Sequence, residues 1–215
     1  MRGGGSGIGI KSAIFGTVDI GNASRQVTGI EHEISKKKNT NIIETAIALD
    51  AISVVVHKSN PLQNLTLSQL KDIYSGKIEN WQELGGKDQE IIVISRDISS
   101  GSFLVFNETV LDSANVKENS MRLPSNNAVA VTVGYTPGAI GYIGLGYVNA
   151  DLKIISINGV LPSRPNVRNG SYILIRNLYM YTSETPRQLA QDFIDFILSE
   201  EGQEIVETQG YVRIK

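Results

Sequence analysis

The sequence predicts an α/β protein, because helix-like and strand-like segments alternate along most of its 215 residues. The apolar run at 42–56 and the shorter segment at 91–94 indicate two largely buried strands, and residues 172–181 alternate as a further strand would. Between the first two strands, Thr66 and Gln69 have the spacing of a capping box, which marks the start of a helix. This order of elements favours a sheet with helices packed against it.

The final helix has the clearest start signal in the chain. Thr185 is expected as its N-cap, Pro186 as its first residue and Gln188 as the partner that closes a capping box. The apolar stripe that we expect to face the core comprises Leu189, Phe193, Phe196 and Ile197. At the other end of the chain, Ile8, Ile14 and Phe15 are expected to form the apolar face of the first helix.

Composition excludes several classes of function. A net charge of −2 without a strongly basic block gives nucleic-acid binding no electrostatic support. Cysteine is absent, which excludes disulfides and thiol catalysis, and the two histidines have no clustered partners for a metal site. No apolar run approaches the roughly 20 residues of a membrane span. We therefore expect no metal, no cofactor and no nucleic-acid partner.

The chain opens with the glycine-rich segment RGGGSGIGIKS, of a kind that often binds phosphate. A P-loop fails because Ile10 stands where lysine is required, and the same residue replaces the third glycine of a dinucleotide-binding motif. What remains is a turn that opens a helix, with unpaired amides beside the hydroxyl of Ser6, and this combination suits an anion. A glycine-rich turn without a ligand is the alternative on these residues alone.

A second anion signal is the segment SRDISSGSF at residues 95–103, expected as a polar loop over 95–102. The planar guanidinium of Arg96 can bond two oxygens of a tetrahedral oxyanion. Ser100, Gly101 and Ser102 add hydroxyls and free amides at a helix start. The alternative here is that Ser100 is a simple N-cap and that Arg96 pairs with Asp97.

A third polar tip, with Ser24 and Arg25, follows the short strand-like segment at 18–21. Ligands of α/β proteins lie at the carboxyl ends of strands, where all three tips are expected. Their convergence favours one oxyanion site over three independent helix caps. No base stands near Ser6 or Ser100 in a pattern that would make either serine a nucleophile, so we expect no catalytic residue.

Taken in order, GGGSGIGI, GTVDIGNASR, LTLSQLKDIYSGKIENWQELGG and SRDISSGSFLVF resemble the substrate-binding protein family of the bacterial phosphate ABC transporter. TPGAIGYIGL and FILSEEGQEIVETQGYV resemble later segments of the same family. The resemblance implies a two-lobed type 2 periplasmic-binding-protein fold with phosphate in the cleft. It implies a first lobe of residues 1–50 and 180–215 and a second lobe of residues 51–179.

The resemblance also implies the phosphate ligands, and they match residue by residue. They are Ser6, Gly7, Ser24, Arg25, Arg96, Ser100, Gly101 and Ser102. Ser102 stands where relatives commonly have threonine, which keeps the hydroxyl donor.

Two departures from the family pattern affect what the resemblance implies. Relatives normally begin with a signal peptide, a strand, a glycine-serine/threonine loop and a helix, so we expect this chain to lack the first strand-helix unit and part of the site. Residues 1–10 also have none of the features of a signal peptide. Some relatives place a carboxylate at the position of Arg25, where it accepts the proton of hydrogen phosphate, so selectivity against sulfate is less secure here.

The function implied is binding of inorganic phosphate by a monomer that delivers it to the permease subunits of an ABC importer. The protein is expected in the periplasm, or anchored outside the cytoplasmic membrane. Three alternatives stay open: a receptor for another oxyanion such as sulfate or molybdate, an enzyme acting on phosphate esters, and an adhesion or signalling protein on the same fold.

Overall fold

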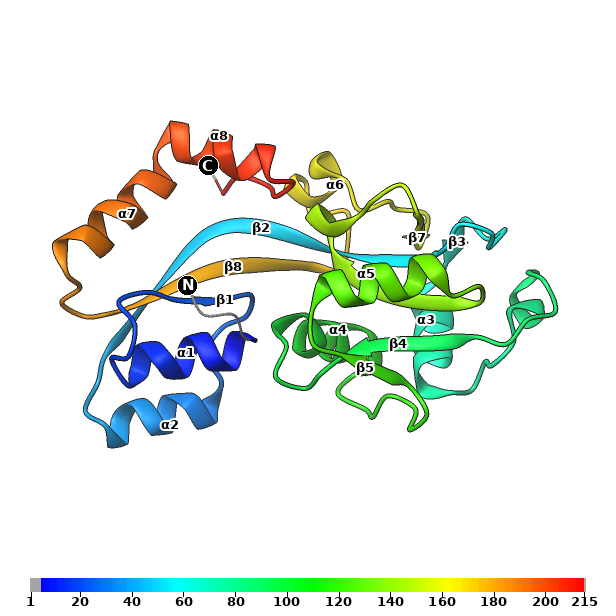
Figure 1. Cartoon of the computed structure of the whole chain (residues 1–215), viewed down its shortest axis with the longest axis horizontal. Helices are drawn as coiled ribbons and strands as arrows, with labels where there is room; N and C mark the ends of the chain where they lie inside the picture. Colours follow the sequence, from blue (N-terminus) through cyan, green and yellow to red (C-terminus); the bar gives the residue numbers. More distant parts are fainter. Residues whose placement is uncertain (1–4, 215) are drawn as a thin grey trace. The chain divides into compact units, whose positions relative to one another are not determined.

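The computed structural model describes residues 5–214, which divide into two compact units (Figure 1). Unit 1 comprises Met1–Asp50, Ser99–Gly101 and Arg176–Lys215, and unit 2 comprises Ala51–Ile98 and Ser102–Ile175. The chain first enters unit 2 within β2 (Ile42–His57) and finally leaves it within β8 (Ile175–Ser183), so both strands contribute residues to both units, and the short segment Ser99–Gly101 belongs to unit 1 in between.

Unit 1 is a small layered structure of strands and helices. Its elements are α1 (Ser6–Ile14), β1 (Gly21–Ala23), α2 (Gly29–Lys37), the first part of β2 (Ile42–His57), nearly all of β8 (Ile175–Ser183), α7 (Gln188–Leu198) and α8 (Glu200–Thr208). The strand order is β1-β8-β2, with β1 antiparallel to β8. Figure 1 shows α1 and α2 on one side of these strands and α7 and α8 on the other.

Close packing of α1 on β1 explains two of the glycines in this part of the chain. A side chain on Gly9 would collide with the carbonyl oxygen of Asn22, and one on Gly21 would collide with the carbonyl oxygen of Gly9. The helix and the strand therefore touch through their backbones, which only glycine permits at this separation.

The buried face of α1 differs from the one that its apolar residues predicted. Ile10, Ala13 and Ile14 are buried and pack with Ala23, Tyr179 and Tyr181, whereas about half of the Ile8 and Phe15 side chains is exposed. The prediction was correct for Ile14 and wrong for Ile8 and Phe15. The reason is the helical spacing. Ile10, Ala13 and Ile14 lie on one face of the helix, which is the buried one, and Ile8 lies on a different face.

The C-terminal helices also depart from prediction. The helix α7 begins at Gln188 after Arg187, which makes no side-chain cap, so Thr185 is not its N-cap. Its buried residues are Ala190 and Ile194, while the expected stripe is largely exposed, with Leu189 at 80%. A second helix, α8, follows after Ser199, whose hydroxyl accepts the amide of Gly202.

Unit 2 is built on a mixed sheet with helices around it. Its elements are the second part of β2, β3 (Asn64–Leu65), α3 (Leu67–Ser75), the 3-10 helix η1 (Trp81–Leu84), β4 (Ile92–Arg96), α4 (Gly101–Leu111, of which Gly101 belongs to unit 1), β5 (Met121–Leu123), α5 (Asn126–Tyr135), β6 (Ala139–Gly144), η2 (Leu145–Tyr147), β7 (Leu152–Ile157) and α6 (Arg164–Arg168). The order is β2-β6-β4-β5. The strand β6 is antiparallel to β2 and parallel to β4, which in turn is parallel to β5.

The capping box predicted for α3 is confirmed. Thr66 Oγ1 accepts the amide of Gln69 at 3.1 Å, and Gln69 Oε1 accepts the amide of Thr66 at 2.8 Å. The expected polar loop at 95–102 is shorter than predicted, because Ser95 and Arg96 belong to β4 and α4 already begins at Gly101.

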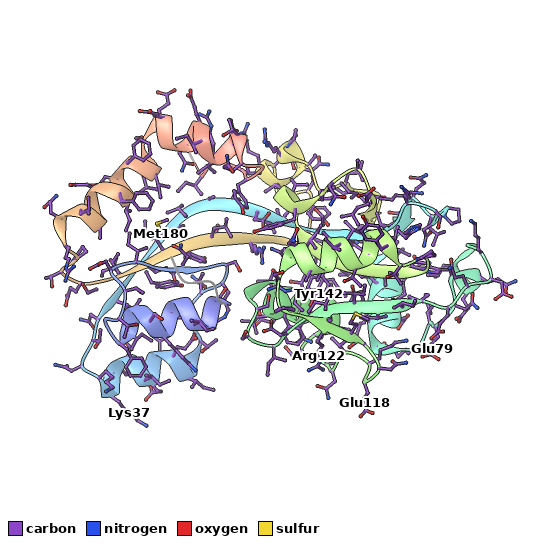
Figure 2. All side chains as sticks on the ribbon, in the orientation of Figure 1. Lys37, Glu79, Glu118, Arg122, Tyr142 and Met180 are labelled. Atoms are coloured by element: carbon purple, nitrogen blue, oxygen red, sulfur yellow. The ribbon has the colours of Figure 1, made fainter. Side chains whose placement is uncertain are left out.

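The core of unit 2 contains a cluster of three aromatic rings from different elements. Tyr74 of α3, Phe106 of α4 and Tyr142 of β6 are buried, and the rings of Phe106 and Tyr142 stack with centroids 3.9 Å apart. Tyr142 lies within the helices and strands of unit 2 (Figure 2). The cluster joins two helices to the sheet at β6, next to the strand that ends in Arg96.

Trp81, the single tryptophan, fixes the loop after α3 to the sheet. It is 1% exposed, and its Nε1 donates to the carbonyl oxygen of Gly138 at 2.9 Å. This contact positions the turn that leads into β6.

Replacing Trp81 by phenylalanine is expected to destabilise the protein by roughly 1–3 kcal/mol, because one buried hydrogen bond and part of the packed volume are lost. Urea unfolding followed by far-UV circular dichroism measures the change. The control is Tyr135→Phe, which alters a side chain that is 79% exposed and is expected to change stability by less than about 0.5 kcal/mol. Equal effects of the two substitutions would contradict an anchoring role for Trp81.

Candidate functional site

The first part of the candidate site lies at the amino end of α1 in unit 1. Gly5 precedes the helix and provides no side-chain cap, so the first amides of α1 have no partner within the helix. Ser6, the first helical residue, is 6% exposed. The amides of Ile8 and Gly9 donate to the Gly5 carbonyl oxygen, so those of Ser6 and Gly7 are the ones that lie before the first turn closes, next to the Ser6 hydroxyl. The partial positive charge at this end of the helix favours an anion.

Ser6 and Ser24 meet although 18 residues separate them. Their hydroxyl oxygens are 3.2 Å apart, and the amide of Ser24 donates to Ser6 Oγ at 3.0 Å. Ser24 follows β1, so the strand brings its hydroxyl to the amino end of α1. Two of the residues predicted from sequence are thus in direct contact.

Gly101 completes this cluster. A methyl group built on its Cα would lie 2.5 Å from Ser6 Oγ and closer still to Ser24 Oγ. Gly101 therefore packs against both hydroxyls with no room for any side chain. The structure brings together Ser6, Ser24 and Gly101, which we call the hydroxyl cluster.

Arg25 lies beside the cluster and is held by a carboxylate. Its Nη1 and Nη2 donate to the two oxygens of Glu31 at 2.7 and 2.9 Å, and a side chain on Gly7 would come within 3.3 Å of Nη2. Glu31 also caps α2 by accepting the amide of Thr28 at 2.9 Å. Burial alone would raise the pKa of Glu31, but the hydrogen bonds and charge of Arg25, together with Thr28, outweigh it and lower the pKa below its ordinary value.

A buried tyrosine fixes the backbone of the same tip. Tyr181 of β8 donates to the carbonyl oxygen of Arg25 at 3.2 Å and to a carboxylate oxygen of Glu44 at 2.6 Å. Burial and the neighbouring charge of Glu44 raise the pKa of the Tyr181 phenol far above its ordinary range, so the phenol stays protonated and keeps donating.

Arg176 touches the hydroxyl cluster and is paired with Asp50, and neither residue was among those predicted from the sequence. Arg176 of β8 donates from Nη1 to Ser24 Oγ at 3.2 Å. Its Nε and Nη2 donate to the same oxygen of Asp50, at 3.0 and 2.7 Å. The sequence does contain a signal for this pair. Asp50 is the single charge in the apolar run AIALDAISVVV, and Arg176 is the single charge in YILIRNLYMY. Because a buried charge is too costly without a partner, two such residues predict a buried ion pair.

Arg96 belongs to unit 2 and is held by the segment that follows β5. Its three side-chain nitrogens donate to the carbonyl oxygen of Leu123 at 3.2 Å, to Asn126 Oδ1 at 2.8 Å and to the carbonyl oxygen of Pro124 at 2.9 Å. Three neutral acceptors thus fix the orientation of the guanidinium. The pairing of Arg96 with Asp97 that was the alternative expectation stays a prediction.

Tyr142 fixes the backbone of Arg96. The amide of Arg96 donates to the Tyr142 oxygen at 3.2 Å, and the same oxygen is 2.9 Å from Ser95 Oγ. Burial raises the pKa of Tyr142, although these hydrogen bonds and the charge of Arg96 oppose the change. The aromatic cluster therefore places the end of β4, and with it Arg96.

The other predicted ligands are buried near helix starts. Ser100 and Ser102 are each 2% exposed, and Ser102 lies in the first turn of α4. Their role as ligands stays a prediction, as does that of Gly7.

The chemistry of the hydroxyl cluster is that of a donor site. Ser6 and Ser24 contact each other, an amide and a guanidinium, and the last two are donors that cannot take a proton from a hydroxyl. His57 contacts Ser59, not either of these serines. Among residues 5–214, no group of three or more acidic, histidine or cysteine side chains could hold a metal ion.

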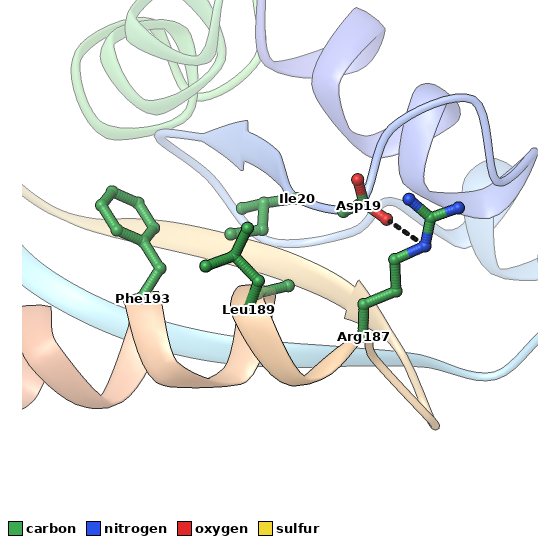
Figure 3. Close-up of a pocket in the computed structure, with 6 residues that line it drawn as sticks. Asp19, Ile20, Arg187, Leu189 and Phe193 are labelled. Atoms are coloured by element: carbon green, nitrogen blue, oxygen red, sulfur yellow. Dashed lines mark ion pairs between the residues drawn. The ribbon is translucent and has the colours of Figure 1, made fainter.

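A separate concavity of unit 1 has a different character (Figure 3). Its volume is about 400 Å³, and Ile20, Leu189, Ala190 and Phe193 supply most of its lining. Asp19 and Arg187 pair across its edge at 3.4 Å, with both side chains largely exposed. An apolar lining with one neutralised ion pair does not suit an inorganic anion, and none of the predicted ligands lines it.

Comparison with known proteins identifies the class of this fold and site. A family model described as "PBP superfamily domain" matches residues 1–201. A solved structure of a putative phosphate ABC transporter substrate-binding protein with bound phosphate, from Clostridium perfringens, is 39% identical. It superposes with a TM-score of 0.92 over 98% of this chain and 85% of that one. The chain belongs to the PBP superfamily of substrate-binding proteins.

Curated relatives place the chain more narrowly. The phosphate-binding protein PstS of Bacillus subtilis is 34% identical, and the match covers all of this chain and 70% of that protein. PstS of Borreliella burgdorferi is 33% identical over 98% of this chain and 78% of its own length. Within the superfamily, this chain is a member of the PstS family of phosphate-binding proteins.

The Arg25–Glu31 pair is expected to contribute stability that depends on pH. Because the folded pKa of Glu31 lies below its ordinary value of 4.5, the contribution is present above about pH 4.5 and is lost as pH falls through the folded pKa. Glu31→Gln is therefore expected to destabilise the protein by roughly 1–3 kcal/mol at pH 7 and by progressively less below pH 4.5. Urea unfolding at several pH values measures this difference.

Glu33→Gln is the matched control on the same helix. Glu33 pairs with Lys36 at 3.1 Å, but both side chains are more than half exposed, so little stability should be lost at any pH. A Glu31→Gln effect that stays constant down to pH 3 would show that the carboxylate charge is not its source.

Proposed function

We propose that this protein binds inorganic phosphate and delivers it to an ABC-type importer. The observation that carries the proposal is the hydroxyl cluster of Ser6, Ser24 and Gly101 at the amino end of α1, in a chain that belongs to the PstS family. The relatives' names and the phosphate bound in the Clostridium perfringens structure support the same ligand.

Hydrogen bonds, not bulk charge, would provide the affinity. Arg25 is neutralised by Glu31 and Arg176 by Asp50, so unit 1 offers hydroxyl and amide donors with little net charge. Arg96 of unit 2 is held in one orientation by three neutral acceptors, and its guanidinium is a charged donor. A phosphate has four oxygens that accept such bonds, and charge-assisted ones are the strongest.

We propose that the phosphate ligands are the eight residues that the family pattern implies: Ser6, Gly7, Ser24, Arg25, Arg96, Ser100, Gly101 and Ser102. We also propose that units 1 and 2 are the two lobes of the family. The contacts within unit 1 and the fixed orientation of Arg96 support the ligand set.

The proposed partners are the permease subunits of the importer, and the proposed location is outside the cytoplasmic membrane, where a PstS-type receptor must meet its ligand. We propose that the protein acts as a monomer. No helix within residues 5–214 has the length and apolar character needed to cross a bilayer.

A second candidate ligand is another tetrahedral oxyanion. Arg25 stands where some relatives have a proton-accepting carboxylate, and the carboxylates of Glu31 and Asp50 are each engaged by an arginine. This arrangement favours a site that accepts sulfate more readily than relatives with a free carboxylate do.

Calorimetric titration tests the proposed function, with phosphate as ligand and sulfate and molybdate as competitors. The protein is expected to bind phosphate saturably, and Arg96→Ala to weaken binding by at least about 100-fold, because two charge-assisted hydrogen bonds would be lost. Arg187→Ala is the control, since its side chain is 83% exposed. A folded protein without phosphate binding would overturn the proposal, and tighter sulfate binding would favour the second candidate.

Gly101→Ala tests the hydroxyl cluster directly. The added methyl group would collide with Ser6 and Ser24, so phosphate affinity is expected to fall at least about 10-fold, the equivalent of one lost hydrogen bond. Gly29→Ala is the matched control, because nothing lies within 4 Å of the position that its methyl group would take. Unchanged affinity in a folded Gly101→Ala variant would place the phosphate elsewhere.

A further inference from the structure

Arg176 contacts the hydroxyl cluster from a fully buried position. Its side chain is 4% exposed and that of its partner Asp50 is 1% exposed. A buried ion pair contributes little net stability compared with well-packed apolar residues, because both charges must first lose their water. The pair is therefore better explained by the contact that Arg176 makes beyond Asp50, in which its Nη1 donates to Ser24 Oγ at 3.2 Å.

The direction of each hydrogen bond in the cluster follows from the donors present. A guanidinium and an amide only donate, so Ser24 Oγ accepts from Arg176 and Ser6 Oγ accepts from the amide of Ser24. Each hydroxyl has one hydrogen, and both hydrogens must point away from these donors. The hydrogen bond between the two hydroxyls uses only one of the two hydrogens. At least one hydroxyl hydrogen is left to donate to a ligand.

We propose that Arg176 is a positioning residue of the phosphate site, which makes Ser24, and through it Ser6, present hydroxyl hydrogens to the anion. The inference rests on the proposed function. Asp50 has two effects on Arg176. It offsets the charge of the guanidinium, and by accepting from Nε and Nη2 it fixes the orientation in which Nη1 donates to Ser24. Arg176 then provides orientation, whereas the hydroxyls make the contact with the anion.

The substitution Arg176→Lys keeps the positive charge at this position but removes the planar guanidinium. The lysine ammonium can pair with Asp50, but its single nitrogen cannot also donate to Ser24 in the way that Nε, Nη2 and Nη1 of the arginine do together. Ser24 would then be free to rotate and to present a lone pair, which repels an anionic oxygen. Arg176→Lys is expected to weaken phosphate binding about 10-fold, as the loss of one oriented hydrogen bond would.

A double-mutant cycle tests the proposal: phosphate affinity is measured by calorimetry for the wild type, Arg176→Lys, Ser24→Ala and the combined variant. If Arg176 acts through the Ser24 hydroxyl, its substitution should have almost no further effect in the Ser24→Ala background, so that the two losses do not multiply. A purely structural role would weaken binding by the same factor in both backgrounds and would overturn the inference. Unchanged affinity of Arg176→Lys would overturn it as well.

The matched control is Arg213→Lys. It alters another arginine of unit 1 that pairs with a carboxylate, Glu207 at 2.9 Å, and should leave phosphate affinity unchanged.

A second variant keeps the test possible if Arg176→Lys does not fold. Asp50→Asn/Arg176→Gln replaces the ion pair by a neutral one, and the same cycle is run with it. Failure of the wild type to bind phosphate would refute the proposed function itself, whereas binding without coupling between positions 24 and 176 would refute only the role of Arg176.

Discussion

The buried pair of Asp50 and Arg176 is the interaction on which the unit 1 site depends. Removing one partner would leave a charge buried without compensation, which typically costs 3–5 kcal/mol. The pair therefore holds the ends of two strand segments together, since Asp50 and Arg176 are the unit 1 residues at which β2 and β8 pass into unit 2. From this fixed point Arg176 reaches Ser24, and the Ser24 amide reaches Ser6.

The same principle governs Arg25 and Arg176 of unit 1 and Arg96 of unit 2. Each guanidinium is a rigid donor that surrounding acceptors hold in one orientation, with carboxylates for Arg25 and Arg176 and neutral carbonyl or amide oxygens for Arg96. In unit 1, the carboxylates of Glu31 and Asp50 offset the charges of Arg25 and Arg176.

Close packing of the elements that carry these polar side chains supports their contacts. In unit 1, the backbones of α1 and β1 touch through Gly9 and Gly21, which brings the Ser24 tip close to the amino end of α1. In unit 2, the stacked rings of Phe106 and Tyr142 hold the phenol that accepts the Arg96 amide. In both units the proposed ligands stand at the ends of elements that pack closely on their neighbours, as preorganisation of a binding site requires.

The sequence by itself determined the features that depend on near neighbours: the α/β class, the capping box of α3 and the glycine-hydroxyl segments that mark the family. Only the tertiary structure decided which side chains are partners. Asp50 and Arg176 are separated by 126 residues, so no local pattern could pair them. The same limit explains the errors at Ile8 and Leu189, because apolar residues show that a helix has a buried face, but the neighbouring elements select which face it is.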